Sequence, residues 1–437
     1  MQLFDFSLKI NGFAIDKAKQ TLSEIQNKSD ADFKAYVEGR KREIVDFHLK
    51  HNSFYKDFGK SIDLNDWNSI PVMTKRHLQQ PIEQRLSEGF STKNVYINKT
   101  SGSSGDPFIF AKDKWCHAMT WAEIMNRFAW YDIDFNCSKQ ARFYGIPLDK
   151  KGYYKERLKD WFANRFRFSV FDLSATNFFN AVAKFKTTPF DYINGYTSAI
   201  VQFAKYLKQQ DLVLTSVCPT LKVCIVTSEM LFEDDKTLME TQFGVPVVNE
   251  YGASELDLIA FQNRNDEWQI NSETLFVEVL DENNRVLPNG EEGRIVITSL
   301  YNKAHPFIRY DIGDLGVLSK SGNFRTPILE QLTGRTNDIA ILPSGKKAAG
   351  LTFYYITKSV IENDGNVSEF VIEQEALDQF TVLYVSKKEL TESQKLFISK
   401  EMKRYLEPGI IITFKRVNVL KRSKSGKLKQ FISNLAS

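Results

Sequence analysis

Five short segments of the sequence carry residues whose types and spacing suit the binding of a nucleotide. The first is Thr100-Ser101-Gly102-Ser103-Ser104-Gly105. Its glycines let the backbone turn tightly, so that successive N–H groups can converge on an anion, and its hydroxyls add donors for phosphate oxygens. The segment differs from the common nucleoside-triphosphate loop because Lys-Ser/Thr does not follow Gly105. Taken alone, such a stretch is more often a flexible connection.

The second and third segments combine carboxylates with glycines. The second is Asn249-Glu250-Tyr251-Gly252-Ala253-Ser254-Glu255, and the third is Tyr310-Asp311-Ile312-Gly313-Asp314. Tyr251 could stack on a base that Gly252 lets the backbone approach, and Glu255 could hold Mg²⁺, which prefers a few carboxylates together with phosphate oxygens. Asp314 suits a ribose diol because a carboxylate accepts two hydroxyl hydrogen bonds. Ordinary turns with solvated acids are the alternative.

The last two segments are basic and lie toward the C-terminus. Gly334-Arg335-Thr336-Asn337-Asp338 stands where composition indicates a domain boundary, so Arg335 could bind phosphate or ribose while its neighbours act as a hinge. Ser423-Lys424-Ser425-Gly426-Lys427 could deliver one lysine from a flexible loop to a distant site. A solvated basic tail is the default interpretation of such a run.

The elements that must position these segments alternate between strands and helices. Residues from about 14 to 50 read as helix, and residues 96–97 predict a short strand that enters the glycine-rich turn. The apolar stripe over 113–130 predicts a helix that follows the turn and whose N-terminus would favour negative charge. Apolar runs at 223–226 and 245–248 predict buried strands of a parallel sheet covered by helices.

The change of pattern along the chain predicts an α/β protein with a large and a small domain. The large domain, 1–332, would have a helical N-terminal region (1–90), a nucleotide-binding core of mixed and parallel sheets covered by helices (91–270) and a β-rich part (271–332). Residues 333–338 would form the hinge and 339–437 a small, mobile α+β domain. In the small domain we expect strands at 368–373, 379–385 and 410–415 and a helix near 391–406.

Composition argues against several classes of protein. Of 437 residues, 42% are hydrophobic and 26% charged, as in ordinary globular proteins, and the net charge of +4 is too small for a nucleic-acid binder. The four cysteines form no C-x-x-C pair, which argues against a zinc site and for reduced thiols. Neither a signal peptide nor an apolar run of membrane-spanning length is seen, so we expect a cytoplasmic protein, a monomer or a homodimer.

Together and in this order, the five segments resemble the motifs of the adenylate-forming superfamily of acyl-CoA synthetases, adenylation domains and luciferases. The chain looks most like the phenylacetate–CoA ligase branch, which includes ligase-like proteins of capsular-polysaccharide gene clusters. Pro306-Phe307-Ile308-Arg309-Tyr310 and Gly195-Tyr196-Thr197-Ser198 favour this branch. The resemblance runs from about residue 95 to 430 and implies an ATP-dependent, AMP-forming ligase.

The resemblance also implies roles for matching positions. Residues 100–105 would hold the β- and γ-phosphates of ATP, Glu255 would bind Mg²⁺, Lys427 would reach the α-phosphate, and Asn337 would lie at the hinge. The adenine and ribose would be bordered by Ser228, Glu229, Asn249, Glu250, Tyr251, Gly252, Asp314 and Arg335. We place the pocket for the acid at Tyr144, Gly145, Tyr196 and Ala253.

The chain departs from the family pattern at three places. Asp106 stands where the family's loop usually has Lys, Glu or Thr, and Asn337 stands where the usual hinge residue is Asp or Lys. Residues 256–275, where some relatives carry a Cys/His zinc cluster, contain neither Cys nor His, so we expect no zinc. These departures leave the adenylation residues intact and bear on the transfer step.

Three functional hypotheses follow. In the first, the chain activates an aryl or other small acid and transfers the acyl group to CoA. In the second, the same adenylate reacts with an amine of a sugar or amino acid in surface-polysaccharide assembly. In the third, the chain is a catalytically inactive nucleotide-binding protein, against which Glu255, Asp314 and Lys427 argue.

Overall fold

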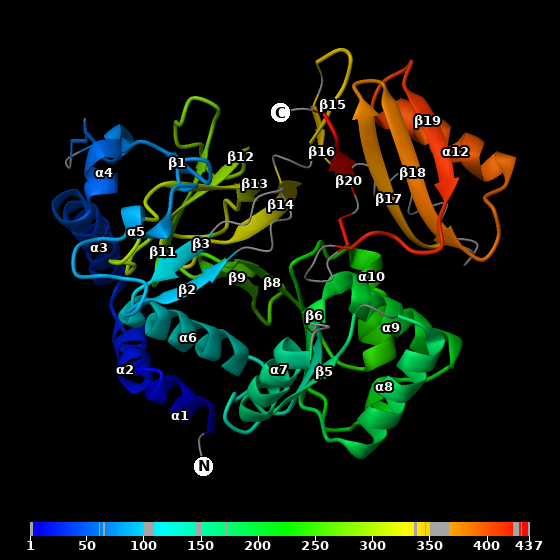
Figure 1. The fold of residues 1–437 in the computed structure, drawn as a ribbon, viewed down its shortest axis with the longest axis horizontal. Coiled ribbons are helices and arrows are strands. Elements are labelled where there is room, and N and C mark those ends of the chain that lie inside the picture. Colours follow the sequence, from blue (N-terminus) through cyan, green and yellow to red (C-terminus); the bar gives the residue numbers. More distant parts are fainter. Residues whose placement is uncertain are drawn as a thin grey trace. The chain divides into compact units, whose positions relative to one another are not determined.

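The computed structural model (Figure 1) contains two compact units. It describes all residues except 1–2, 61, 64–65, 100–108, 146–149, 171–172, 336–338, 346, 350–366, 423–427, 430 and 436–437. The first unit consists of Met1–Ile312 and Val317–Glu330, and the second of Gly313–Gly316 and Gln331–Ser437. The chain passes between the units within strand β13 (Tyr310–Leu318) and again within β14 (Leu329–Arg335).

The first unit begins with helices. They are α1 (Leu3–Ile10), α2 (Ile15–Gln26), α3 (Asp30–His51), α4 (Ser53–Phe58), the 3-10 helix η1 (Trp67–Ser69) and α5 (Ile82–Arg85). The helix predicted over about 14–50 is confirmed, but it is divided into α2 and α3 by a break that was not predicted. A new helix starts after Ser29, whose side chain accepts a hydrogen bond from the Asp32 N–H at 3.2 Å and so satisfies a free helix-end donor.

A seven-stranded sheet forms the centre of the first unit, in the order β10-β9-β8-β7-β6-β4-β5. Its strands are β4 (Gln140–Phe143), β5 (Arg165–Phe168), β6 (Tyr192–Tyr196), β7 (Val223–Thr227), β8 (Val247–Ala253), β9 (Asp257–Gln262) and β10 (Trp268–Ile270). Strands β5, β4, β6, β7 and β8 run parallel, whereas β9 and β10 are antiparallel to their neighbours. The carboxyl ends of the parallel strands therefore share one edge.

Helices cover both faces of this sheet. They are α6 (Lys114–Ala129), α7 (Lys150–Phe162), α8 (Ala175–Thr187), α9 (Thr197–Gln209), the 3-10 helix η2 (Leu214–Ser216) and α10 (Glu233–Phe243). Alternate residues of β7 enter different clusters: Val226 packs with Phe203 of α9, and Ile225 packs with Phe128 of α6. Every residue of β7 is buried, which explains its continuous apolar sequence and confirms the predicted strand.

A second sheet has the order β1-β13-β12-β11, with β14 beside β13. Its further strands are β1 (Met73–Thr74), β11 (Leu275–Leu280) and β12 (Glu292–Ser299), and a separate two-stranded hairpin pairs β2 (Tyr96–Lys99) with β3 (Ile109–Lys112). Strands β11 and β12 pair antiparallel, as predicted for the chain after residue 270. This sheet places Tyr310 and the segment that follows it.

The second unit contains a four-stranded sheet in the order β19-β18-β17-β20. Its elements are β17 (Val367–Ala376), β18 (Gln379–Ser386), α12 (Glu392–Tyr405), β19 (Ile411–Arg416) and β20 (Phe431–Ser433), and a separate hairpin joins β15 (Ile339–Ile341) to β16 (Lys347–Ala349). Helix α12 begins with a capping box, in which Thr391 and Gln394 each bind the other's backbone N–H. The sheets and helices of the two units confirm the predicted α/β fold class.

Candidate active site

The serine- and glycine-rich segment at 100–105 lies outside the described residues, but both strands that flank it are described. Strand β2 ends at Lys99 and pairs antiparallel with β3, so that Lys99 lies opposite Ile109. The helix predicted over 113–130 is confirmed as α6, although strand β3, which was not predicted, stands between the loop and that helix. The N-terminus of α6 is capped instead by the Asp113 carboxylate, which accepts the Cys116 N–H at 2.8 Å.

The β2–β3 hairpin is tied to the turn that carries Glu255. Lys112, the last residue of β3, is 2% exposed and forms an ion pair with Asp257 at the start of β9. Lys112 and Glu255 also line the same small cavity. Since four strand residues span on the order of 13 Å, the loop end of the hairpin, at Lys99 and Ile109, lies about that far from this contact.

Glu255 is buried in the turn between β8 and β9. Its Oε1 accepts a hydrogen bond from the Tyr310 hydroxyl at 2.9 Å. Tyr310 begins β13, which also carries Asp314, so the second and third sequence motifs are linked through a direct contact. The sequence interpretation gave Tyr310 no role; its place in the Tyr-x-x-Gly-Asp motif is the signal that could have suggested one.

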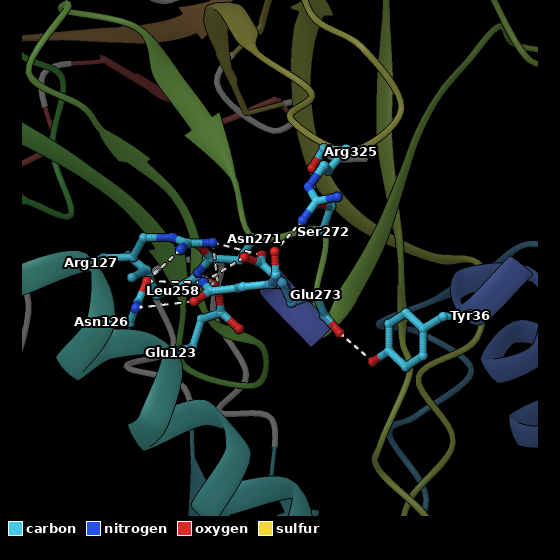
Figure 2. A network of polar contacts seen from close by, with 10 residues as sticks. Tyr36, Glu123, Asn126, Arg127, Leu258, Asn271, Ser272, Glu273 and Arg325 are labelled. Carbon is cyan, nitrogen blue, oxygen red and sulfur yellow. Dashed lines mark hydrogen bonds and ion pairs between the residues drawn. The ribbon is translucent and has the colours of Figure 1, made fainter. Parts of the chain in front are cut away.

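A cluster of buried charges surrounds Arg127 (Figure 2). One member, Glu123, lines the same cavity as Glu255, and this cavity of ≈ 10 Å³ has room for about one water molecule. Nη2 of Arg127 lies 2.7 Å from Glu123 Oε1 and 2.7 Å from Glu273 Oε2. Burial, reinforced by the Glu273 charge, raises the pKa of Glu123 well above its ordinary value. Burial alone would raise the pKa of Glu273, but the charge and hydrogen bond of Arg127 outweigh burial and lower that pKa. One guanidinium thus contacts one carboxyl group whose pKa is raised and one whose pKa is lowered.

Two predicted acid-pocket residues meet at the carboxyl edge of the central sheet. The ring centroids of Tyr144, which follows β4, and Tyr196, which ends β6, are 4.4 Å apart. The Arg142 guanidinium lies 4.1 Å from the Tyr144 ring centroid. Arg142 was not predicted, although β4 alternates polar Gln140 and Arg142 with apolar residues, as a strand with one polar face does.

The segment after β7 contributes a strained residue and a helix cap. Ser228 has a φ of 71°, a left-handed conformation that costs energy for a side-chain-bearing residue. Glu229 Oε2 accepts the Ser198 N–H at 2.7 Å, and its carbonyl accepts the Thr197 hydroxyl at 3.2 Å. The Glu229 carboxylate therefore occupies the N-terminus of α9, where the helix dipole favours a negative charge.

Strand β8 presents its glycine, rather than its tyrosine, to the surface. Tyr251 is buried with its ring edge-on to Trp268 at 5.8 Å, whereas Gly252 is exposed. A Cβ on Gly252 would lie 2.4 Å from the Asp257 carbonyl oxygen, so only glycine fits here. The N–H of Asn249 donates to Gln262 Oε1 at 3.0 Å, and Ala253 ends the strand beside the Glu255 turn.

Glu250 titrates close to neutral pH. Burial raises its pKa to about 7, although the Thr227 hydroxyl and the Arg142 charge pull it back down. Thr227 lies directly opposite Glu250 in the β7–β8 pairing. At neutral pH this carboxyl is therefore divided between its acid and its carboxylate, and it can accept or give up a proton at the sheet edge.

We expect Glu250→Gln to change how stability depends on pH. Because the folded-state pKa is raised, the stabilising contribution of the protonated form is complete below the unfolded pKa and is lost as pH rises through about 7. Urea unfolding of the wild type should therefore lose about 2 kcal/mol more than the variant between about pH 5 and pH 8. Glu291→Gln, at an exposed turn, is the control; equal pH profiles for wild type and Glu250→Gln would contradict the shift.

The remaining predicted residues belong to the second unit. Asp314 is buried on β13, and Arg335 ends the neighbouring strand β14. Asn337 and Lys427 fall outside the described residues. The proposed hinge and catalytic lysine therefore stay predictions, and so do the ribose contacts of Asp314 and Arg335.

The residues around Glu255 suit a magnesium ion. Of the two carboxylate oxygens of Glu255, only Oε1 accepts a hydrogen bond from the described residues. The second oxygen, Oε2, is left for a cation. Mg²⁺ needs only one or two carboxylates when phosphates supply further ligands. Within the described part of the chain no group of three or more His, Cys, Asp or Glu side chains could hold a metal by itself. Likewise, none of the described helices is long and apolar enough to cross a bilayer.

Comparison with known sequences finds two curated relatives. The chain is 24% identical over 435 residues to "Protein CapK" of Staphylococcus aureus, covering 95% of this chain and 90% of that protein. It is 31% identical over 128 residues to a phenylacetate-coenzyme A ligase of Aromatoleum evansii, covering 28% of this chain and 29% of the ligase. No family model matches the sequence.

Solved structures share the fold. A 2-hydroxyisobutyryl-CoA ligase, solved with R3-HIB-AMP in the postadenylation state, superposes with a TM-score of 0.71 at 17% identity and covers 93% of this chain and 91% of its own. The amide bond synthetase McbA of Marinactinospora thermotolerans has a TM-score of 0.53 at 12% identity, covering 79% of this chain and 70% of its own. The resemblance drawn from the motifs is thereby confirmed: the chain has the adenylate-forming ligase fold, and its sequence relatives are CapK and phenylacetate–CoA ligase.

Proposed function

We propose that the protein is an AMP-forming carboxylate ligase that activates a small organic acid with ATP and transfers the acyl group to coenzyme A. The observation that carries the proposal is the ion pair between Lys112 and Asp257. This contact joins the stem of the predicted phosphate loop to the turn that holds Glu255. Two residues 145 positions apart in the sequence are therefore in contact, which supports a shared triphosphate site between the loop and the Glu255 turn.

The chemistry to be catalysed is the attack of one anion on another. A carboxylate must approach the α-phosphorus of ATP, so catalysis rests on positioning and on neutralising charge. Mg²⁺ held by Glu255 would supply positive charge on the phosphates. The Tyr310 hydroxyl fixes the Glu255 carboxylate, and Lys427 would add a second positive charge near the α-phosphate. The acid displaces pyrophosphate, and the resulting acyl-adenylate then reacts with the thiol of CoA.

The acid is proposed to bind beside the paired rings of Tyr144 and Tyr196. Two aromatic side chains at van der Waals distance form a flat apolar wall, which suits an aryl or other compact acid. Arg142 behind Tyr144 keeps positive charge near this wall. A substituent that accepts a hydrogen bond would therefore be tolerated better than one that carries a positive charge.

A second acceptor, the amine of a sugar or an amino acid, is supported by two observations. The fold is shared with an amide bond synthetase as well as with CoA ligases. Glu250, with a pKa of about 7 at the sheet edge, could take the proton that an ammonium acceptor must lose before it attacks.

Coupled assays separate the two acceptors. ATP–pyrophosphate exchange should identify the acid from a panel that includes phenylacetate, anthranilate and 2-hydroxyisobutyrate, and CoA should then yield AMP and a thioester. Amide formation with an amino-sugar nucleotide, without a thioester, would move the assignment to the amine. Absence of exchange with every acid, together with absence of ATP binding, would contradict ligase activity.

Replacing Glu255 with Gln should slow ATP–pyrophosphate exchange by about 10²-fold and raise the Mg²⁺ concentration needed for half-maximal rate. Glutamine still accepts the Tyr310 hydrogen bond but carries no charge for the cation. Tyr310→Phe is the matched variant: it keeps the carboxylate and removes one hydrogen bond, so we expect about a tenfold loss at most. An unchanged Mg²⁺ requirement in Glu255→Gln would remove Glu255 from the metal site.

A further inference from the structure

Three arginines lie close together on the neighbouring strands β4 and β5, and two of them have acidic partners. Arg142 of β4 lies opposite Arg167 of β5, and Arg165 precedes Arg167 by two residues on the same strand. Arg165 and Arg167 both form ion pairs with Asp160, and Arg167 also pairs with Glu156. Arg142 forms no ion pair within the part of the chain that the structure describes. Among those residues its positive charge therefore has no counter-ion.

The guanidinium of Arg142 also has hydrogen-bond donors that are not used. Its Nε is buried without a hydrogen-bond partner. Its two Nη nitrogens are not buried, and they donate to no acceptor among the described residues. The guanidinium carbon lies 4.1 Å from the centroid of the Tyr144 ring, and this contact holds the group without supplying an acceptor in its plane. The Nη donors therefore stay available to a bound molecule.

Arg142 lies beside the two aromatic rings to which the acid is proposed to bind. Tyr144 follows Arg142 by two residues and contacts its guanidinium. On β6, Asn194 lies opposite Arg142, and Tyr196 follows Asn194 by two residues on the same face of the strand. The Asn194 amide is already hydrogen-bonded to β4 and β7, at 3.2 Å in each case. A molecule that packs against the two tyrosine rings is therefore within reach of the Arg142 guanidinium.

The charges around Arg142 favour an additional anion. Burial lowers the pKa of Arg165 to about 10, and the positive charge of Arg142 contributes to that change, so the two guanidinium groups repel each other. The charge of Arg142 also acts on Glu250, but burial raises the pKa of that carboxyl group to about 7. Glu250 is therefore only partly ionised at neutral pH and does not balance Arg142. An anionic group of a ligand would relieve this excess of positive charge.

We propose that Arg142 binds a second carboxylate of the acid substrate, so that the acid is a dicarboxylic acid. The inference rests on the proposed ligase function and specifies its substrate class. A guanidinium binds a carboxylate through two parallel N–H···O hydrogen bonds, which the two Nη nitrogens can supply. The other carboxylate of the substrate is then the one that attacks the α-phosphorus and displaces pyrophosphate. Arg142 determines which acid binds and takes no part in that displacement.

A purely structural role of Arg142 predicts a different result. If the guanidinium only supports the Tyr144 ring, its removal should impair every acid by the same factor. If it binds a second carboxylate, its removal should impair acids that have this group and spare the difference in rate among the others. The ratio of kcat/KM between two matched acids therefore separates the two roles, because effects on folding and on ATP binding cancel in the ratio.

Matched pairs of acids that differ only in the second carboxylate test the proposal. The pairs are succinate with propionate, glutarate with butyrate, and 4-carboxyphenylacetate with phenylacetate. In ATP–pyrophosphate exchange, the kcat/KM of the wild type should be at least about tenfold higher for one diacid than for its monoacid. This preference should disappear in Arg142→Gln, chiefly through KM, and Arg142→Lys should lie between because lysine keeps the charge without the planar fork. Arg285→Gln, which removes an exposed arginine from a turn, should keep the wild-type ratio.

Calorimetric titration of the same acids without ATP distinguishes this inference from the ligase activity. Binding of a diacid that depends on Arg142, without exchange for any acid, would support the carboxylate site and contradict the ligase. Exchange without preference for any diacid would support the ligase and overturn the inference. The inference would also be overturned if Arg142→Gln kept the preference for the diacid, and absence of both exchange and diacid binding would overturn both proposals. Unfolding midpoints check that the variants fold, and Arg142→Lys carries the comparison if Arg142→Gln does not.

Discussion

Replacing Lys427 with alanine should slow formation of the acyl-adenylate by about 10²–10³-fold while ATP still binds. The carboxylate and the triphosphate repel each other, and an ammonium aimed at the α-phosphate relieves that repulsion most where negative charge gathers in the transition state. The ground-state complex keeps the phosphate loop, Glu255 and the adenine contacts, so affinity for ATP should change little. ATP–pyrophosphate exchange and nucleotide titration measure the two quantities separately.

The control for this prediction is Lys421→Ala, which removes an exposed lysine from the same C-terminal stretch. Both variants lose one positive charge, so a general electrostatic effect would slow them equally. A further readout is thioester formation from synthetic acyl-adenylate and CoA, which should survive in Lys427→Ala if the lysine acts only in the first half-reaction, as we propose. If exchange in Lys427→Ala matches that in Lys421→Ala, the lysine has been assigned wrongly.

The fold could be predicted from the sequence wherever burial imposes an apolar pattern on an element. Strand β7 is covered on both faces, so it had to be apolar throughout and was recognised. Strand β3 was missed: it has four residues, and what stabilises it is pairing with β2 and the contact of Lys112 with Asp257. The break at Ser29 was missed because one cap hydrogen bond ends a helix whose composition favours continuing.

The candidate site likewise contains some residues that the sequence predicts and others that it does not. Motifs identify residues such as Glu255 and Asp314 because phosphate and ribose chemistry demands particular groups. The motifs do not identify the partners of these residues. Tyr310 contacts Glu255, and Arg142 packs against Tyr144, only because particular strands lie side by side. Strand order is set by the whole core, and no local spacing encodes it.

The largest effect on stability is expected from Arg127→Met. Arg127 is 1% exposed, and its guanidinium binds Glu273 and Asn271 as well as contacting Glu123. Removing it leaves the Glu273 carboxylate in the interior without a positive charge beside it, although the Gln26 amide still donates to it. Breaking a buried ion pair from one side costs about 3–5 kcal/mol, because the remaining charge is neither hydrated nor neutralised. Urea unfolding at neutral pH should show a loss of this size.

Glu123→Gln is the matched variant on the other side of the same guanidinium. Because burial raises the pKa of Glu123 well above its ordinary value, we expect the amide to mimic the side chain in nearly the same shape, and the cost should be about 1 kcal/mol or less. The carboxyl groups of Glu123 and Glu273 contact the same Arg127 nitrogen. A purely steric account therefore predicts similar losses of stability in Glu123→Gln and Arg127→Met. Our account predicts a clear difference, and losses of equal size would show that Glu123 is ionised.

A triple replacement separates charge from packing in this cluster. With Glu123→Leu, Arg127→Met and Glu273→Met together, no charge stays buried, so most of the stability lost in Arg127→Met should return. Tyr36, which donates to the Glu273 carbonyl at 2.7 Å, keeps its backbone partner throughout. If the triple variant is no more stable than Arg127→Met, the loss comes from the shape of the site. In that case the cluster behind Glu255 owes its stability to packing, and adenylation measured in the triple variant would show whether the cluster also positions Glu255.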